Sequence, residues 1–178
     1  IIEHNDIFDT VKETGDHGTI NSWGRDRFWH PKYNVMTQIT DENPALILAD
    51  VVEPIIIRHN RLRCDRGWDI DLDDGSSNYQ IYNNLCLNGG IKLREGFYRT
   101  VENNIIVNNT LHPHLWFKNS GDVFSRNIVM TKYKPIRVYG WGREVDYNIF
   151  TDSLAYLAAR QLGGDVHSIV TTITVSYT

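Results

Sequence analysis

Carboxylates are concentrated in residues 69–74 (DIDLDD), and a further carboxylate, Glu95, stands 21 residues after Asp74. Two cations, Lys92 and Arg94, precede Glu95 closely. Two carboxyl groups can divide acid and base roles between them when a neighbouring cation keeps one ionised and burial keeps the other protonated. These residue types in this order therefore indicate acid–base chemistry, provided that the fold brings the two segments together.

A repeat in the sequence predicts how the two segments meet. Short apolar runs begin at Ile70, Ile91, Leu115 and Ile136, which are separated by 21, 24 and 21 residues. Self-similarity at a period of about 20 to 25 residues, with short strands in each unit, is typical of a solenoid. The sequence thus predicts an all-β fold, a right-handed, single-stranded parallel β-helix in which these four residues stack as one buried column.

Asparagines mark the breaks between the strands, at Asn60, Asn83-Asn84 and Asn108-Asn109. Asparagine suits tight turns because it tolerates left-handed backbone conformations, and stacked amides form ladders along a solenoid. An antiparallel β-sandwich would have similar strand spacing. It needs hairpin turns, however, and only Asp74-Gly75 and Asn88-Gly89 have the sequence of one. The parallel β-helix is therefore favoured.

The repeat organises residues 1–178 as a single β-helix domain with three departures. Residues 24–53 break the period and are expected to form an irregular insertion that roofs a groove. Residues 153–162 (SLAYLAARQL) predict a short C-terminal helix. Residues 169–178 form an atypical, uncharged, β-prone tail, which is a sticky edge unless something covers it. We expect a fragment of a longer protein whose ends depend on the remainder of the β-helix or on a homo-oligomer.

Composition narrows the classes of function. The net charge of −4 argues against nucleic-acid binding, and no apolar run approaches the roughly 20 residues of a membrane span. The histidines lack zinc-type spacing. Residues 69–75 are similar to the start of an EF-hand loop, but the glycine comes one position late and Gln80 replaces the bidentate glutamate. No metal and no cofactor are therefore expected, with a generic Ca²⁺ site as the alternative.

Strand alternation directs the polar neighbours of the apolar column outward. One predicted outward column contains Asp71, Lys92, Trp116 and Arg137, and the next contains Asp73, Arg94, Lys118 and Tyr139. Because coils stack ~4.8 Å apart, carboxylates on adjacent coils approach the ~5 to 5.5 Å separation of retaining glycosidases.

Within this arrangement Glu95 is the expected acid/base, Asp73 the expected nucleophile and Asp71 its nearest rival. The alternative is an ion ladder without chemistry, in which Lys92 and Arg94 neutralise acids on the preceding coil. Aromatic and cationic side chains near the strand ends suit the faces and hydroxyls of sugars. The expected substrate-binding residues are Trp68, Lys92, Arg94, Trp116, Lys118 and Trp141.

Two segments, residues 14–27 and 67–75, resemble bacterial right-handed parallel β-helix repeat proteins. The region of the carboxylates is also similar to two groups of β-helix glycoside hydrolases, the family 120 β-xylosidases and the family 141 α-L-fucosidases. In the β-xylosidase group an aspartate on one coil and a glutamate on the next perform the reaction, which the resemblance places on Asp73 (or Asp71) and Glu95. It covers about residues 1–167 and implies a secreted or periplasmic bacterial protein.

The first expected function is thus a retaining glycoside hydrolase acting on a plant or algal poly- or oligosaccharide. A second is a Ca²⁺-dependent polysaccharide lyase, with Asp69, Asp71 and Asp73 holding the ion and Arg94 or Lys92 as base. A third is a non-catalytic β-helix that binds carbohydrate without turnover.

Overall fold

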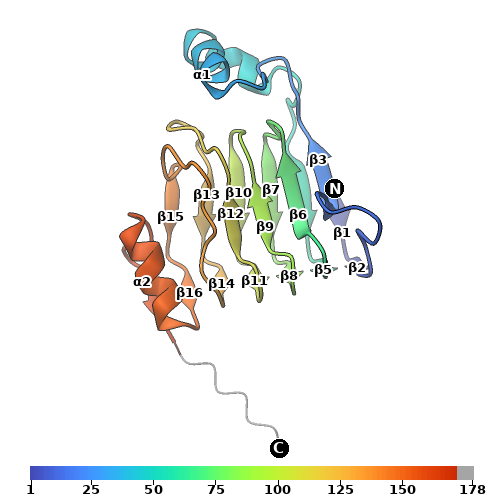
Figure 1. Cartoon of the computed structure of the whole chain (residues 1–178), viewed down its shortest axis with the longest axis vertical. Helices are drawn as coiled ribbons and strands as arrows, with labels where there is room; N and C mark the ends of the chain where they lie inside the picture. The colour runs from blue at the N-terminus through green and yellow to red at the C-terminus, as the bar shows by residue number, and fades with distance from the viewer. Residues whose placement is uncertain (172–178) are drawn as a thin grey trace, which may run out of the picture.

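The computed structural model describes residues 1–171, which form a parallel β-solenoid (Figure 1). Within this range, the paired strands all run parallel, so the predicted parallel β-helix is confirmed. From residue 172 onward, the predicted atypical tail (169–178) lies outside the described residues.

Three sheets make up the walls of the solenoid. Sheet A contains β1 (Ile2–Glu3), β4 (Ile55–Arg58), β7 (Tyr79–Tyr82), β10 (Arg99–Glu102), β13 (Val123–Ser125) and β15 (Glu144–Asp146). Sheet B contains β2 (Asp6–Ile7), β5 (Arg61–Leu62), β8 (Leu85–Cys86), β11 (Ile105–Ile106), β14 (Ile128–Val129), β16 (Ile149–Phe150) and β17 (Ile169–Val170). Sheet C contains β3 (Gly18–Trp23), β6 (Trp68–Asp73), β9 (Ile91–Leu93) and β12 (Leu111–Pro113).

The core is built by inward apolar residues of the strands, stacked coil upon coil. In sheet A the buried stack is Ile57, Ile81, Val101, Phe124 and Val145. In sheet B it is Leu62, Cys86, Ile106, Val129 and Phe150. Full burial of each large apolar side chain contributes about 1.5 to 3 kcal/mol, so the repeat itself provides most of the driving force for the fold.

A ladder of buried asparagines closes the turn between sheets A and B, and its five members are Asn60, Asn84, Asn104, Asn127 and Asn148. The amide nitrogen of each donates to the side-chain oxygen of the next, at 3.0 to 3.3 Å. The same amides bind backbone groups of two coils. The prediction of turn asparagines with stacked amides is therefore confirmed at Asn60 and Asn84, whereas the ladder continues through Asn104 and not through Asn108 or Asn109.

Asn104→Ala is expected to lower the free energy of unfolding by about 3 kcal/mol, because it leaves buried backbone groups of two coils without partners. The side chain of Asn104 bonds the carbonyls of Ile81 and Glu102 and the amide of Asn84. Urea denaturation measures the change. Asn103→Gly is the matched control, since Asn103 is exposed and glycine accepts its φ of 54°. Equal losses in the two variants would contradict a structural role for the ladder.

The register of sheet C confirms the first half of the predicted column and corrects the second. Ile70 pairs with Ile91, as predicted. The residue that pairs with Ile91 on the following coil is Leu111, not Leu115. Ile136 makes an isolated bridge to His114 and is 49% exposed. The predicted buried column is therefore wrong at Leu115 and Ile136.

This change of register also alters the predicted outward columns. Asp71 lies beside Lys92, as predicted, but the next member is His112 rather than Trp116. Leu115 has a left-handed φ of 54°, so the backbone leaves the strand there and the alternation breaks. Trp116 consequently points into the core, where it is fully buried. Lys118 and Tyr139, for the same reason, do not continue the column of Asp73 and Arg94.

The predicted insertion 24–53 contains two helical segments that the sequence pattern did not reveal, α1 (Tyr33–Glu42) and the 3₁₀ helix η1 (Pro44–Leu48). Figure 1 shows α1 beyond one end of the sheets. A second apolar core holds it there, in which Phe28 and Met36 pack with Phe97 and Phe117 of the solenoid.

The predicted C-terminal helix is confirmed as α2 (Ser153–Gln161), whose first turn is capped by Asp152. Ala155 and Ala159 bury one face of this helix in the solenoid core. Within residues 1–171, none of the helices combines the length and apolar character that crossing a membrane requires.

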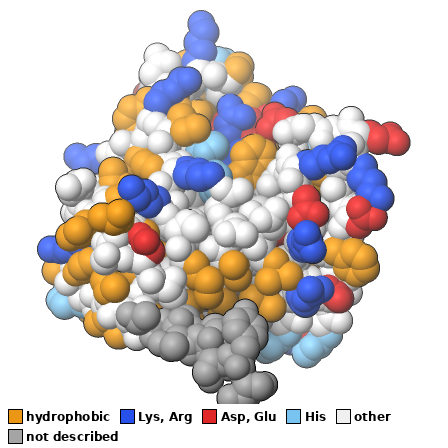
Figure 2. Space-filling model, turned by 60° about the horizontal axis from the view of Figure 1, so that its bottom comes forward, with side chains coloured by type: hydrophobic (Ala, Val, Ile, Leu, Met, Phe, Trp, Pro, Cys, Tyr) orange, Lys and Arg blue, Asp and Glu red, His pale blue; other side chains and the backbone are white. Residues whose placement is uncertain are grey.

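The outer face of sheet B carries a row of aliphatic side chains. Its members are Leu85, Ile105, Ile128, Ile149 and Ile169, which lie opposite one another in the register and are partly or largely exposed. Figure 2, which brings the lower end of Figure 1 forward, shows hydrophobic side chains gathered at this end. The row is a natural place for the predicted homo-oligomer contact, which stays a prediction.

Candidate functional site

The residues singled out by the sequence meet where β6 and β9 end in sheet C. Asp71 of β6 lies beside Lys92 of β9, and Asp73 and Glu95 follow at the ends of these two strands. All four point away from the apolar core, yet each is at most 5% exposed. The outer face of this sheet is therefore a buried polar layer and not an open surface.

An alternating chain of charges runs through this layer. Lys92 Nζ lies 3.0 Å from an oxygen of Asp71 and 3.3 Å from one of Asp73. Arg94 Nη1 donates to Asp73 Oδ1 at 3.0 Å, and Arg94 Nε donates to Glu95 Oε2 at 2.8 Å. Asp73 and Glu95 thus bind the same guanidinium. Lys92 and Arg94 therefore flank Asp73, the candidate nucleophile.

The insertion is fastened directly to these carboxylates. Arg25 pairs with Asp74, with Nε and Nη2 at 2.9 and 2.8 Å from Oδ2, and its guanidinium lies over the rings of Trp23 and Trp29. Trp29 Nε1 donates to Glu95 Oε1 at 3.3 Å. We call the insertion, residues 24–53, the roof. It supplies one of the two side-chain hydrogen bonds that fix the orientation of the Glu95 carboxylate.

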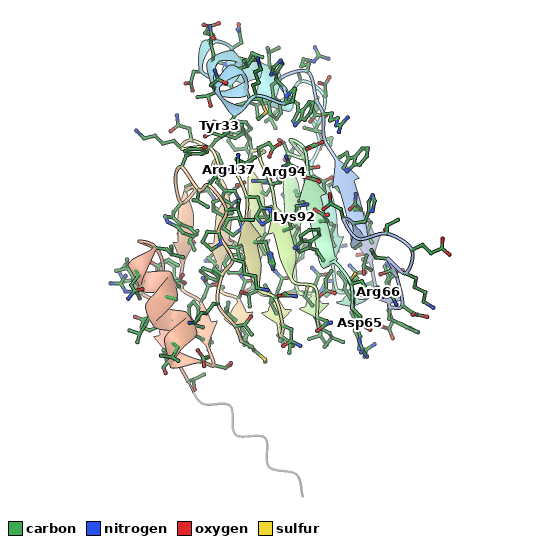
Figure 3. All side chains as sticks on the ribbon, in the orientation of Figure 1. Tyr33, Asp65, Arg66, Lys92, Arg94 and Arg137 are labelled. Atoms are coloured by element: carbon green, nitrogen blue, oxygen red, sulfur yellow. The ribbon has the colours of Figure 1, made fainter. Side chains whose placement is uncertain are left out.

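Two adjoining clefts open onto the charged layer. The larger, about 460 Å³, lies under the roof and is lined by Trp29 and Glu95 among others. The smaller, about 220 Å³, is lined by Trp68 and Lys92. Arg94, Leu115 and Arg137 line both. Figure 3 shows Arg94 and Arg137 at the roof end of the strands below Tyr33, with Lys92 further along the sheet.

The environments of the two candidate catalytic carboxyls shift their pKa values in opposite directions. Burial raises the pKa of Glu95, and Arg94 offsets this only in part. Burial also acts to raise the pKa of Asp73, but Lys92 and Arg94 together outweigh it, and the pKa of Asp73 is lowered. Burial raises the pKa of Asp71 to about 6 despite Lys92. Asp73 is thus held ionised, whereas the raised pKa values of Glu95 and Asp71 let both of these groups retain a proton to higher pH than Asp73 does.

Asp69 has a structural task. Its carboxylate accepts hydrogen bonds from the backbone amides of Cys64, Asn88, Gly89 and Gly90, at 2.7 to 3.1 Å. It therefore connects the chain before β6 to the turn before β9. With Asp69 engaged in this way and Lys92 between Asp71 and Asp73, the three aspartates do not present a set of free oxygens to Ca²⁺.

The six predicted substrate-binding residues separate into two groups. Trp68, Lys92 and Arg94 line the clefts. Trp116 is buried and donates to the carbonyl of Leu93, Trp141 packs against Trp116 at the core, and Lys118, although exposed, lines neither cleft. The last three are separated from the site by the register change after Pro113.

Two histidines of the next coil border the site. His112 Nδ1 accepts a hydrogen bond from Trp68 Nε1 at 3.2 Å, and His114 lines the smaller cleft. Burial lowers the pKa of His112 to about 3 and that of His114 to about 4. Both imidazoles are therefore neutral near pH 7 and add no charge to the layer.

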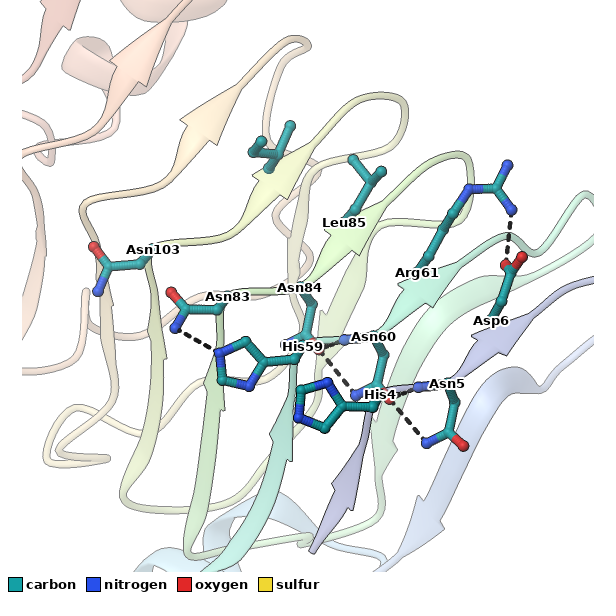
Figure 4. A pocket seen from close by; sticks show the side chains of 11 residues that line it. His4, Asn5, Asp6, His59, Asn60, Arg61, Asn83, Asn84, Leu85 and Asn103 are labelled. Atoms are coloured by element: carbon teal, nitrogen blue, oxygen red, sulfur yellow. Dashed lines mark hydrogen bonds and ion pairs between the residues drawn. The ribbon is translucent and has the colours of Figure 1, made fainter.

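Another cleft, of about 620 Å³, follows the asparagine corner (Figure 4). His4 and His59 stack there on successive coils at 5.1 Å, and together with Glu3 their ligand atoms lie within 4.8 Å of one another. The rings are parallel to within 3°, so their nitrogen lone pairs lie in parallel planes and do not converge on one ion. Arg58 also holds the carboxylate of Glu3 at 2.6 Å. This corner therefore has less capacity for chemistry than the sheet C site.

No protein-family model, no curated protein and no solved structure matches this chain. The resemblance to β-helix glycoside hydrolases therefore stays an expectation from the sequence alone.

Proposed function

We propose that this chain carries the site of a retaining glycoside hydrolase that acts on a plant or algal poly- or oligosaccharide. One observation carries the proposal: Asp73 and Glu95, on neighbouring coils, flank one guanidinium and have pKa values shifted in opposite directions. Two titratable groups whose environments separate their pKa values are the usual mark of an acid and base pair.

The proposed roles follow from protonation. Asp73, kept ionised by Lys92 and Arg94, attacks the anomeric carbon and forms a glycosyl-enzyme. Glu95 gives its proton to the departing glycosidic oxygen and later takes one from the attacking water. Two oxygens bound to one guanidinium lie within about 8 Å of each other, which is compatible with the ~5 to 5.5 Å separation of retaining glycosidases.

Glu95 must release one of its present partners to act on a substrate. Both of its oxygens accept hydrogen bonds, from Arg94 at 2.8 Å and from Trp29 at 3.3 Å. The longer contact involves the roof, and Oε1 is the oxygen that faces Trp29. We therefore assign Oε1 as the atom that carries the proton to the glycosidic oxygen, which takes the place of the Trp29 N–H.

The ion ladder without chemistry uses the same contacts, so access to the ladder distinguishes the two. Arg94 and Glu95 line the larger cleft and Lys92 the smaller, which favours a site. Asp73 lines neither cleft and is 5% exposed, so its proposed attack requires that substrate binding displaces Arg94 or Lys92 from it. The lyase alternative needs a base, and Lys92 and Arg94 are engaged by carboxylates in this arrangement.

A screen of plant and algal polysaccharides and their oligomers tests the reaction class. A retaining hydrolase releases reducing ends, gives no unsaturated product that absorbs in the ultraviolet, and yields a first product with the anomeric configuration of the substrate by NMR. An unsaturated product would identify a lyase. Binding of sugars with no turnover would identify a non-catalytic β-helix.

Trp29→Phe is expected to move the alkaline limb of the kcat/KM profile to higher pH. The Trp29 N–H stabilises ionised Glu95, so its loss raises the pKa of Glu95 further. An acid is active while protonated, and activity therefore persists to higher pH. Trp23→Phe is the control. The Arg25 guanidinium lies over the ring of Trp23 as it does over that of Trp29, but the hydrogen bond to Glu95 comes from Trp29. An alkaline limb that does not move would exclude Glu95 as the titrating acid.

A further inference from the structure

Arg137 differs from the other cations of the two clefts. Lys92 and Arg94 are neutralised by the aspartates of β6 and by Glu95, and Arg25 pairs with Asp74. Arg137 is exposed and lines both clefts. Its guanidinium makes no ion pair or hydrogen bond with any residue from 1 to 171, so it is a cation without a partner at the junction of the two clefts.

Each cleft has more cations than acids in its lining. Arg25, Arg94 and Arg137 line the larger cleft together with two acids, Asp74 and Glu95. Arg94, Arg137 and Lys92 line the smaller one together with a single acid, Asp16. The excess grows when Glu95 is protonated, as its proposed role requires. Lys92 and Arg94 are already paired with Asp71 and Asp73 behind this lining, so the unpaired positive charge at the junction is that of Arg137. A negatively charged group is its electrostatic complement.

An aromatic surface stands beside Arg137. Tyr139, two residues on, stacks on Tyr33 of the roof with ring centroids 4.2 Å apart, and both rings line the larger cleft. Tyr139 is 51% exposed. An amphipathic ring next to a free guanidinium suits a pyranose that carries an anionic group, because the sugar face packs on the ring while the anion binds the guanidinium fork.

The backbone holds Arg137 in a fixed position. Leu115 and Arg137 occupy left-handed conformations on successive coils, with φ of 54° and 50°, and the amide of Leu115 donates to the carbonyl of Ile136 at 2.9 Å. Left-handed residues also form other turns of the solenoid, such as Asn83, Asn103 and Arg126. At Arg137 the turn sets where the side chain leaves the backbone.

We infer that Arg137 makes this site selective for anionic sugars, that is, for a residue bearing a carboxylate or a sulfate group. The inference rests on the proposed function for the place of the reacting bond, but the preference itself is a binding property. It predicts that Arg137 forms a bidentate contact with the anion between the two clefts.

Calorimetry with two matched pairs of oligosaccharides tests this selectivity. One pair is an oligouronide and its neutral methyl ester, and the other is a sulfated galactan oligomer and its desulfated counterpart. The wild-type chain should bind the anionic member of one pair at least about tenfold more tightly, as expected for charge-assisted hydrogen bonds. The pair that shows the difference distinguishes carboxylate from sulfate.

Arg137→Gln should reduce that preference to less than about threefold, and Arg137→Lys should retain part of it, because lysine keeps the charge without the fork. Arg143→Gln is the control, since Arg143 is exposed and lines neither cleft. Equal affinity within both pairs, no binding to any of the four ligands, or a full preference in Arg137→Gln would each overturn the inference. A preserved anion preference without turnover would instead refute the proposed hydrolase alone.

Discussion

Asp73→Asn is expected to lower kcat at least about 10³-fold on any glycoside that the chain hydrolyses, because it removes the proposed nucleophile. The amide is nearly isosteric, but it leaves Lys92 and Arg94 with one counter-charge fewer. Circular dichroism and urea denaturation must therefore accompany the kinetics, so that lost turnover is not confused with lost fold.

Glu95→Gln is expected to lower kcat by about 10² to 10⁴-fold, the usual contribution of a general acid. The loss should be smaller for a substrate whose leaving group needs no proton, such as an activated aryl glycoside. Added azide should rescue the deglycosylation step of this variant. Asp73→Asn should yield an azide product of the opposite anomeric configuration, because azide then attacks the substrate directly.

Asp71→Asn is the variant that separates the two aspartates, since Lys92 binds both of them. If Asp71→Asn abolishes turnover while Asp73→Asn spares it, Asp71 is the nucleophile. Full activity in both Asp73→Asn and Glu95→Gln, accompanied by lower stability, would show that the charged layer is an ion ladder.

The sequence pattern predicted the period of the solenoid well because each coil repeats one physical requirement, an inward apolar residue on each short strand. It predicted the neighbours Asp71 and Lys92 for the same reason. It could not distinguish Leu111 from Leu115 as the partner of Ile91, because a shift of four residues leaves the inward and outward alternation unchanged. The left-handed turn at Leu115 then reversed the direction of Trp116.

The sequence pattern could not predict the contacts of the roof, for a different reason. Residues 24–53 contain no repeat unit, so no spacing rule places Arg25 or Trp29 beside Asp74 or Glu95. Their contacts depend on how the insertion folds back over the solenoid. The composition of the insertion, rich in aromatic side chains, was the available signal, and it indicated a roof without indicating which carboxylates the roof contacts.

Asp122→Ala is expected to lower the free energy of unfolding by about 3 to 5 kcal/mol, the usual effect of breaking a buried ion pair. Arg99 and Asp122 are both fully buried. Arg99 Nε and Nη2 bind the two carboxylate oxygens at 2.9 and 2.6 Å, and the Arg99 backbone amide also donates to Oδ1. Without Asp122, the guanidinium stays in the interior with no counter-charge.

The double variant Arg99→Met with Asp122→Leu should recover most of this stability, because two apolar side chains leave no uncompensated charge. Its activity should stay low. Arg99 Nη1 also binds the carbonyls of Ser76 and Arg94, which belong to the segments that follow Asp73 and precede Glu95. The ion pair therefore positions the backbone of the two catalytic candidates from inside the core. Urea denaturation and glycosidase assays on the same preparations separate the two effects. A double variant that regains both stability and turnover would confine Arg99 to a structural role. Regained stability with a lowered kcat and an unchanged KM would establish Arg99 as a positioning residue.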